Sequence, residues 1–174
     1  MLKHKLSTAH ILIQAAKAAI VVALLYCFSV MTAHKFNYIF SPWPLWSFRL
    51  GMIISCIAAV FIVRIQQRGY ITYPQGILSA VSAALMLGIF ISIFTYVFQT
   101  SIYPEYQTAH KQIYYRGLEL DGWTLEQATK QIEERWNFYF TTKGSMIIDI
   151  ISSLAWGFMI AITIGYMARR VPEE

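Results

Sequence analysis

The chain has 174 residues, of which 57% are hydrophobic and 13% are charged. Soluble globular proteins are about half apolar and about a quarter charged, so this composition argues against a water-soluble domain. The formal net charge of +5 would suggest nucleic acid in a soluble protein. Here the basic residues flank apolar blocks, so we expect them to face lipid headgroups, and we expect membrane lipids rather than nucleic acid as partners.

Four apolar blocks predict four transmembrane helices, because each block is long enough to cross a hydrocarbon core of about 30 Å. Lipid offers no hydrogen bonds to the backbone, so such segments must be helical. We therefore predict an all-α, polytopic four-helix bundle that forms a single membrane domain over residues 1–174. The predicted helices cover about 11–31, 45–63, 77–98 and 146–167. The first block could also be a secretory signal, but its length and the lack of a cleavage site favour a retained helix.

The long connection between the third and fourth blocks, about residues 100–145, predicts an extramembrane amphipathic helical hairpin. Its first helix is expected to begin at Pro104 and to end near Gly117. A turn at Asp121-Gly122 then precedes a second helix with a Thr124–Gln127 capping box. Helical spacing assigns one face of the second helix to Leu125, Ala128, Ile132, Trp136 and Tyr139.

Basic residues predict the orientation of the chain in the membrane. They are dense in the two tails and in the second connection, and this asymmetry favours a multi-pass protein with both termini in the cytoplasm. The residues are Lys3 and Lys5, Arg64 and Arg68, and Arg169 and Arg170.

Aromatic residues gather on the opposite side, in the first connection and in the hairpin. Such rings favour the headgroup layer, so the hairpin either lies near the outer surface or uses the rings as its own core. Exposed aromatic residues are also frequent anchors of protein interfaces. We therefore predict a partner surface formed by Tyr114, Tyr115, Trp123 and Trp136.

Small residues recur every fourth position in all four blocks. Lipid tails are as apolar as leucine, so helices associate in a membrane where small side chains allow their backbones to approach closely. The two longest rows are predicted to mediate helix packing, and a further face could join a second copy of the chain. These rows are Gly76, Ala80, Ala84 and Gly88, and Ser153, Gly157, Ala161 and Gly165.

Three ionisable residues fall inside the blocks: Lys17, Arg49 and Asp149. Lys17 is close enough to its helix end to reach the headgroups with its long side chain. Arg49 and Asp149 each lie about one turn inside their blocks, counted from the same side. Their matched depth suggests an intramembrane ion pair, and separate snorkelling of the two side chains is the alternative.

The sequence contains no motif for catalysis, for a cofactor or for a metal. The four histidines are isolated, and the two cysteines, Cys27 and Cys56, lie in apolar blocks without a CxxC pair. No metalloprotease, nucleophile-elbow, dinucleotide or phosphate-loop pattern is present. We expect no enzymatic activity.

Two short motifs carry a resemblance to a known family. Residues 68–74, before the third block, read RGYITYP, and residues 102–106, after it, read IYPEY. The chain resembles bacterial membrane proteins grouped as "domain of unknown function 4199", which have four predicted helices and a helical insertion before the last one. This resemblance implies a bacterial inner membrane and a periplasmic hairpin, and it implies no activity.

Two functions remain open at this stage. The first is a non-enzymatic structural, interaction or accessory protein that acts through helix packing and through its hairpin, with a protein partner or a second copy of itself. The second is a small transporter or channel subunit, which would need an oligomer or a cavity lined by polar residues.

Overall fold

The computed structural model describes residues 7–168, and helices are the only extended regular elements in that range. Four helices are long and apolar enough to cross a membrane: α1 (Thr8–Lys35), α2 (Trp43–Gln66), α3 (Tyr73–Val97) and α6 (Thr142–Ala168). The predicted all-α fold with four membrane-spanning helices is confirmed. The basic residues of the two tails, Lys3, Lys5, Arg169 and Arg170, lie outside the described residues.

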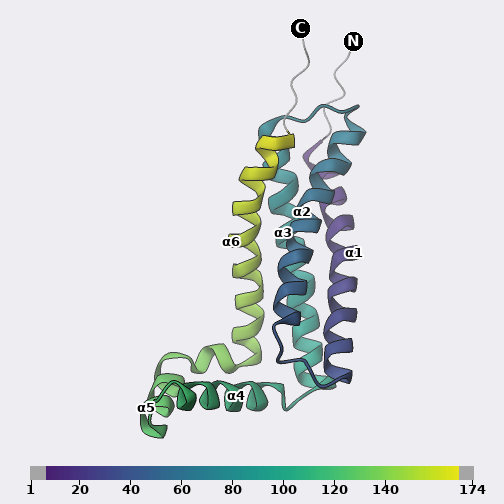
Figure 1. The fold of residues 1–174 in the computed structure, drawn as a ribbon. Helices are drawn as coiled ribbons and strands as arrows, with labels where there is room; N and C mark the ends of the chain where they lie inside the picture. Colours follow the sequence, from purple (N-terminus) through teal and green to yellow (C-terminus); the bar gives the residue numbers. More distant parts are fainter. Residues whose placement is uncertain (1–6, 169–174) are drawn as a thin grey trace. The chain divides into compact units, whose positions relative to one another are not determined.

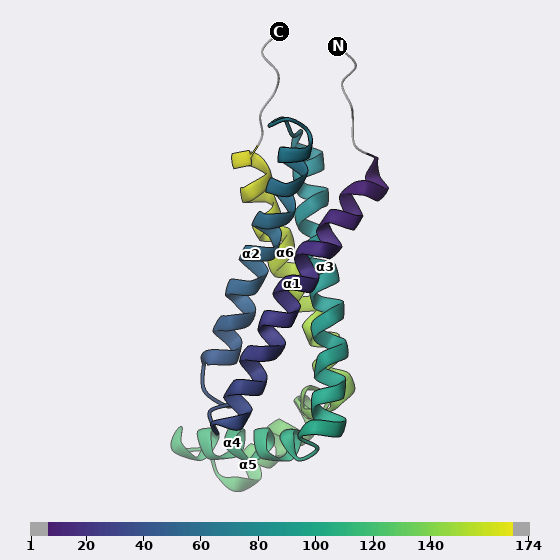
Figure 2. The same ribbon diagram turned by 90° about the vertical axis from the view of Figure 1, so that its right-hand side faces the viewer.

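The chain divides into two compact units. One comprises Met1–Ile91 and Ile150–Glu174, and we call it the bundle unit; the other is Ser92–Asp149, and we call it the connector unit. In the bundle unit, α1, α2, α3 and α6 run side by side in both views of the ribbon (Figures 1 and 2).

Helix ends in the bundle unit follow local sequence signals. The Ser7 hydroxyl caps α1 by accepting a hydrogen bond from the backbone N–H of His10 at 3.3 Å. After α1, Asn37 adopts a positive φ of 59°, which reverses the chain before α2. Between α2 and α3, Arg68 and Gly69 have φ values of 57° and 90°, and the chain turns there.

The core of the bundle unit is built from small and aliphatic side chains. Ala19 and Ala23 of α1, Cys56 of α2 and Ala80 and Ala84 of α3 are all buried in one cluster. α3 and α6 approach each other closely, because a Cβ placed on Gly157 would overlap the Cβ of Ala84. At this contact only glycine allows the two backbones to come together.

Large apolar side chains of the bundle unit point outward instead. Leu24, Leu25 and Phe28 of α1 are 65%, 64% and 74% exposed. In water this surface would be unfavourable, but in a membrane lipid tails cover it at no hydrophobic cost. The arrangement of small residues inside and large residues outside is therefore that of a bundle in lipid.

The connector unit contains α4 (Tyr106–Leu120), α5 (Leu125–Lys130), two π-helical turns, η1 (Phe98–Ile102) and η2 (Gln131–Arg135), and a 3₁₀ turn, η3 (Asn137–Phe140). The predicted end of the first helix near Gly117 is wrong, because α4 continues to Leu120. Glycine is tolerated there since it is exposed and its helical φ is ordinary, and the chain reverses at Gly122, where φ is 85°.

The second helix of this segment begins as predicted and then departs from the prediction. Thr124 and Gln127 form the predicted capping box, and Ala128 and Ile132 are fully buried. The π turn η2 then interrupts the helix, so the predicted face does not continue as one. Phe140 is buried and Tyr139 is 39% exposed, because a π turn shifts the register of the residues that follow it.

We predict that Gly157→Leu destabilises the bundle by about 1–3 kcal/mol, because the new side chain has no room against Ala84. The thermal unfolding temperature of the detergent-solubilised protein should fall. Ala155→Leu is the matched control, since Ala155 is exposed on the same helix. Equal unfolding temperatures for the two variants would contradict this account of the α3–α6 contact.

Candidate functional site

A row of aromatic rings runs through the connector unit. Phe98 contacts Tyr106 with ring centroids 5.8 Å apart, and Tyr106 contacts His110 at 5.7 Å. His110 contacts Phe140 at 5.3 Å, and Phe140 contacts Tyr114 at 5.5 Å. Tyr106, His110 and Tyr114 are spaced four residues apart on α4, so one face of this helix supplies three of these five rings.

The row continues at its far end toward the surface. Tyr139 contacts both His110 at 6.1 Å and Phe140 at 5.5 Å, and Trp136 meets Tyr139 edge-on at 6.2 Å. Edge-to-face contacts of this kind contribute about 0.5–1.5 kcal/mol beyond the buried area. The rings therefore form the internal core of the connector unit, and the outermost ones reach solvent.

Burial changes the titration of two members of this row. Burial raises the pKa of Tyr106 to about 12, and repulsion from Tyr139, Asp149 and Tyr103 adds to the effect. Burial also lowers the pKa of His110, because the aromatic surroundings disfavour the imidazolium form. Both groups are thus held neutral at physiological pH, and neither is poised as a general acid or base.

A polar cluster lies in the same unit, where the end of α3 and the start of α6 carry matching polar residues. The Thr95 hydroxyl donates a hydrogen bond of 2.7 Å to the Asp149 carboxylate. The Gln107 amide donates to the Gln99 carbonyl at 2.7 Å and to the Ser145 hydroxyl at 2.9 Å. Thr95 and Gln99 are four residues apart, as are Ser145 and Asp149, so each pair occupies one helix face.

This cluster links three helical segments through one side chain, Gln107 of α4. Gln99 is only 7% exposed, and the side-chain oxygen of Gln107 is buried without a hydrogen-bond partner among residues 7–168. Buried amides need such partners, so the bonds that do form hold α4 against the ends of α3 and α6. The cluster is therefore a structural joint.

The arrangement offers little for chemistry. Among residues 7–168 no three His, Cys, Asp or Glu side chains are close enough to hold a metal ion. Asp149 accepts its hydrogen bond from a threonine rather than from a base.

Two of the four residues of the predicted partner surface, Tyr114 and Trp136, belong to the aromatic row. Tyr114, Trp123 and Trp136 are 37%, 40% and 43% exposed. The structure brings Tyr114 and Trp136 together through Phe140 and Tyr139. Trp123 lies in the turn after α4. Tyr115 is half-buried instead, and the Lys111 ammonium lies 6.0 Å from its ring.

The two predicted packing rows lie on α3 and α6, and each of their residues with a described side-chain environment is buried. Gly76, Ala80, Ala84 and Gly88 of α3 are buried, as are Ser153, Gly157 and Ala161 of α6. Gly157 and Ala84 are brought into direct contact. Gly165 belongs to α6, and its surroundings lie outside the described part of the chain.

The predicted ion pair involves residues of both units. Arg49, in the bundle unit, places its guanidinium 5.2 Å from the ring of Trp46 and 5.8 Å from that of Trp156. Asp149, in the connector unit, accepts the hydrogen bond from Thr95. The pair between Arg49 and Asp149 stays a prediction. Lys17 is exposed on α1, as a side chain that reaches toward headgroups must be.

Sequence reasoning missed the residues that join the connector unit together. Tyr106, His110 and Tyr114 share four-residue spacing, and this signal was available in the sequence. No such signal existed for Gln107 and Ser145, because they are 38 residues apart and meet only through the fold. His110 was set aside as an isolated histidine, but it is the centre of the aromatic row.

The profile of a family described as "Protein of unknown function (DUF4199)" matches residues 15–170. The chain belongs to this family. The match includes the connector unit and most of all four membrane-spanning helices, so the resemblance seen in the sequence motifs holds along nearly the whole DUF4199 protein. Neither a curated protein nor a solved structure matches the chain. Function must therefore be argued from geometry.

We predict that Gln107→Leu weakens the connector unit, because it leaves the Gln99 carbonyl and the Ser145 hydroxyl without their donor. The cost of such a loss is about 1–3 kcal/mol. Amide hydrogen exchange in residues 98–120 should become faster. Gln112→Leu, at an exposed position of the same helix, should leave exchange unchanged. Equal exchange rates in the two variants would show that the hydrogen bonds of Gln107 do not stabilise the connector unit.

We further predict that acid loosens the connector unit through His110. Its pKa in the folded unit is below the ordinary value of 6.5, so the unfolded unit binds the proton more readily. The stability is fully present above pH 6.5 and is lost as the pH falls from there toward the lowered pKa. Proteolysis of the unit should therefore accelerate in that range.

His110→Phe tests this pH dependence, because phenylalanine keeps the ring contacts and cannot be protonated. His110 is the only histidine of the connector unit. The variant should lose the acceleration of proteolysis below pH 6.5. The prediction is wrong if the wild type and the variant respond to acid equally.

Proposed function

We propose that this DUF4199 protein is a non-enzymatic interaction protein that presents an aromatic surface of its connector unit to a protein partner. The surface consists of Tyr114, Trp123 and Trp136. The observation that carries this proposal is that these three large rings stay exposed, while Phe140 packs against Tyr114 and Tyr139 packs against Trp136. Rigid, exposed aromatic residues are frequent anchors of protein interfaces.

Charge favours a protein partner over the membrane surface. Residues 92–149 contain five basic and seven acidic residues, so the connector unit has a net negative formal charge. Helices that bind anionic bilayer surfaces are instead rich in lysine and arginine. A protein partner with an apolar interface does not require lysine or arginine on the surface that it contacts.

The proposal includes an orientation. Arg64 lies in the last turn of α2 and Arg68 in the connection to α3, and basic residues also occur in both tails of the sequence. This distribution supports termini in the cytoplasm of a bacterial cell, in its inner membrane, and a connector unit in the periplasm. The partner would then be periplasmic or would have a periplasmic domain.

The alternative function, a small transporter or channel subunit, has weaker support. The polar side chains buried in the described part of the bundle unit are hydroxyls and amides: Gln14, Ser55, Gln75, Ser79, Ser82 and Ser153. Ion and proton pathways commonly use carboxylates, histidines or basic residues near the membrane centre. The geometry of residues 7–168 therefore supports an interaction protein better than a transporter.

We predict that a photo-crosslinking residue in place of Tyr114 captures one recurrent protein in native membranes. The double variant W123A/W136A should abolish this adduct, because it removes the two neighbouring anchors. Glu126→Ala is the matched control, since Glu126 is exposed in the same unit and is not aromatic. The proposal fails if only lipid adducts form, or if the control and the double variant behave alike.

A further inference from the structure

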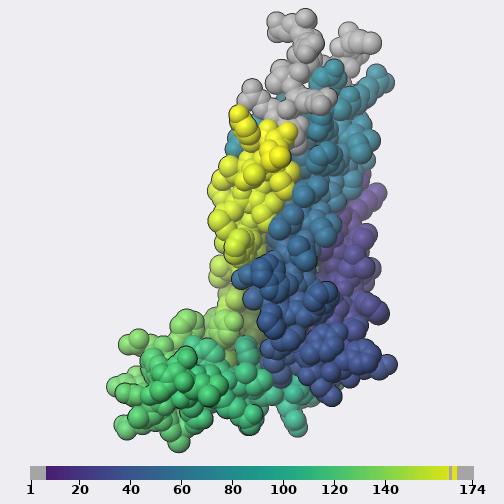
Figure 3. Space-filling view, in the orientation of Figure 1, coloured from purple at the N-terminus to yellow at the C-terminus, as the bar shows by residue number. Residues whose placement is uncertain are grey.

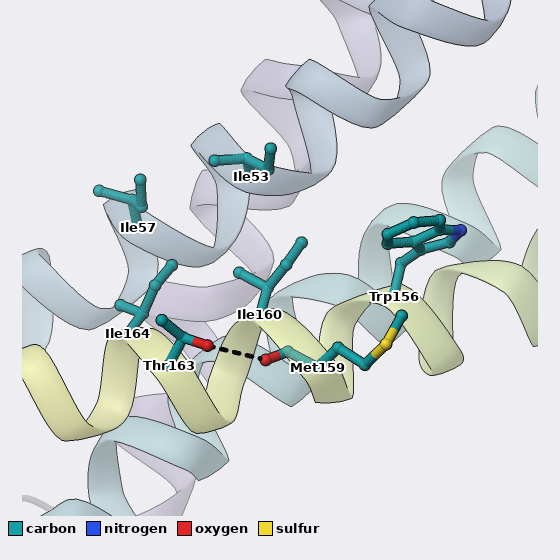
Figure 4. A pocket seen from close by; sticks show the side chains of 7 residues that line it. All are labelled: Ile53, Ile57, Trp156, Met159, Ile160, Thr163 and Ile164. Carbon is teal, nitrogen blue, oxygen red and sulfur yellow. Dashed lines mark hydrogen bonds between the residues drawn. The ribbon is translucent and has the colours of Figure 1, made fainter.

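An open groove of about 350 Å³ runs between α2 and α6 on the surface of the bundle unit. Figure 3 shows the side chains of α6, in yellow, directly beside those of α2, in blue. Ile53 and Ile57 line the groove from α2, and Trp156, Ile160 and Ile164 line it from α6 (Figure 4). The volume is within the range of roughly 300–1,000 Å³ that is usual for ligand sites.

The interior of the groove suits hydrocarbon. Thr163 is the one hydroxyl among its lining residues, and this hydroxyl donates to the backbone oxygen of Met159 in its own helix at 3.4 Å (Figure 4). Apart from the indole N–H of Trp156, the groove therefore presents mainly aliphatic, thioether and indole surface. A water-soluble ligand would gain few hydrogen bonds there.

A cation marks one end of this groove. Arg49, Ile53 and Ile57 are spaced four residues apart, so they share one face of α2. The Arg49 guanidinium lies 5.8 Å from the ring of Trp156, which itself lines the groove. Arg49 is thus held at the Trp156 end by two indole rings, since Trp46 flanks it at 5.2 Å.

No acidic residue of the described bundle unit can neutralise Arg49. Residues 7–91 and 150–168 contain neither aspartate nor glutamate. A guanidinium near hydrocarbon is costly without an anion, and its planar fork matches phosphate oxygens in pairs. Charge complementarity therefore points to an anion supplied from outside the bundle unit.

The depth of Arg49 fits a lipid headgroup. Arg49 is six residues from the start of α2, or about 9 Å along the helix axis, and its long side chain can reach outward from there. The groove extends from Trp156 to Ile164, about 12 Å further along the axis. This length is close to half of a hydrocarbon core of about 30 Å, so much of one acyl chain can lie along it.

We propose that the groove between α2 and α6 binds one anionic phospholipid, with an acyl chain along Ile53, Ile57, Ile160 and Ile164 and with its phosphate on Arg49. A second copy of the bundle would cover the apolar surface but would bring no acidic residue from the same described ranges to Arg49. A phospholipid supplies both an acyl chain for the groove and a phosphate for the Arg49 guanidinium. This site is independent of the partner surface on the connector unit.

The test is native mass spectrometry of the full chain in mild detergent, with phosphatidylglycerol or phosphatidylcholine of identical acyl chains. We expect one phosphatidylglycerol to be retained in preference to phosphatidylcholine. Arg49→Gln should weaken that retention about tenfold, the usual scale for the loss of a charge-assisted hydrogen bond. Arg49→Lys should weaken it less, because the charge remains and only the fork is lost.

Matched variants separate the groove from general lipid contact. Ile57→Trp should fill the groove and displace the lipid, whereas Leu24→Trp, on the lipid-facing side of α1, should not. Lys17→Gln removes another intramembrane cation and should leave retention unchanged. Unfolding temperatures of all variants check that each one is folded.

Several results would overturn the proposal. Equal retention of the two lipids would show that Arg49 does not select a phosphate. Unchanged retention in Arg49→Gln would show that Arg49 is committed elsewhere, as in the ion pair with Asp149 predicted from the sequence. A dimer that Ile57→Trp dissociates would show that a second copy, and not a lipid, occupies the groove.

Discussion

Close backbone contact between helices is the constraint on which the rest of this protein depends. In a bilayer, burial of apolar surface between helices gains almost nothing, because lipid tails offer the same environment. Stability must come from van der Waals packing at short range, and the contact of Gly157 with Ala84 provides it between α3 and α6. Small residues therefore occupy the interior of the bundle unit, and large ones remain available for lipid.

The same constraint explains where function can reside. A bundle interior filled by small and aliphatic side chains leaves little room for a ligand, so the binding surfaces lie on the outside. The connector unit exposes two tryptophans, one of which packs on a row of edge-on and tilted rings, and the bundle unit exposes a groove beside an arginine. We propose a protein for the first surface and a lipid for the second, so the two surfaces suit different partners.

The four membrane-spanning helices and the small-residue rows could be read from the sequence, because hydropathy and four-residue spacing are local properties. The capping box of α5 was equally local. The π turn η2 was not, since the sequence around Ile132 continues a helical pattern that tertiary packing interrupts. The same distinction holds for the candidate site. The tryptophans of the connector unit could be proposed from the sequence as surface anchors. The hydrogen bonds of Gln107 to Gln99 and Ser145 could not, because they depend on long-range contacts.

The π turns η1 and η2 have a further consequence for how this fold can vary in length. Each holds a residue more per turn than an α-helix, which is equivalent to a single inserted residue absorbed without unwinding the helix. Both lie in the connector unit. Insertions or deletions of one residue there can convert between π and α geometry, whereas the same change within α2 or α6 would rotate the Gly157 face, or the groove, by about 100°.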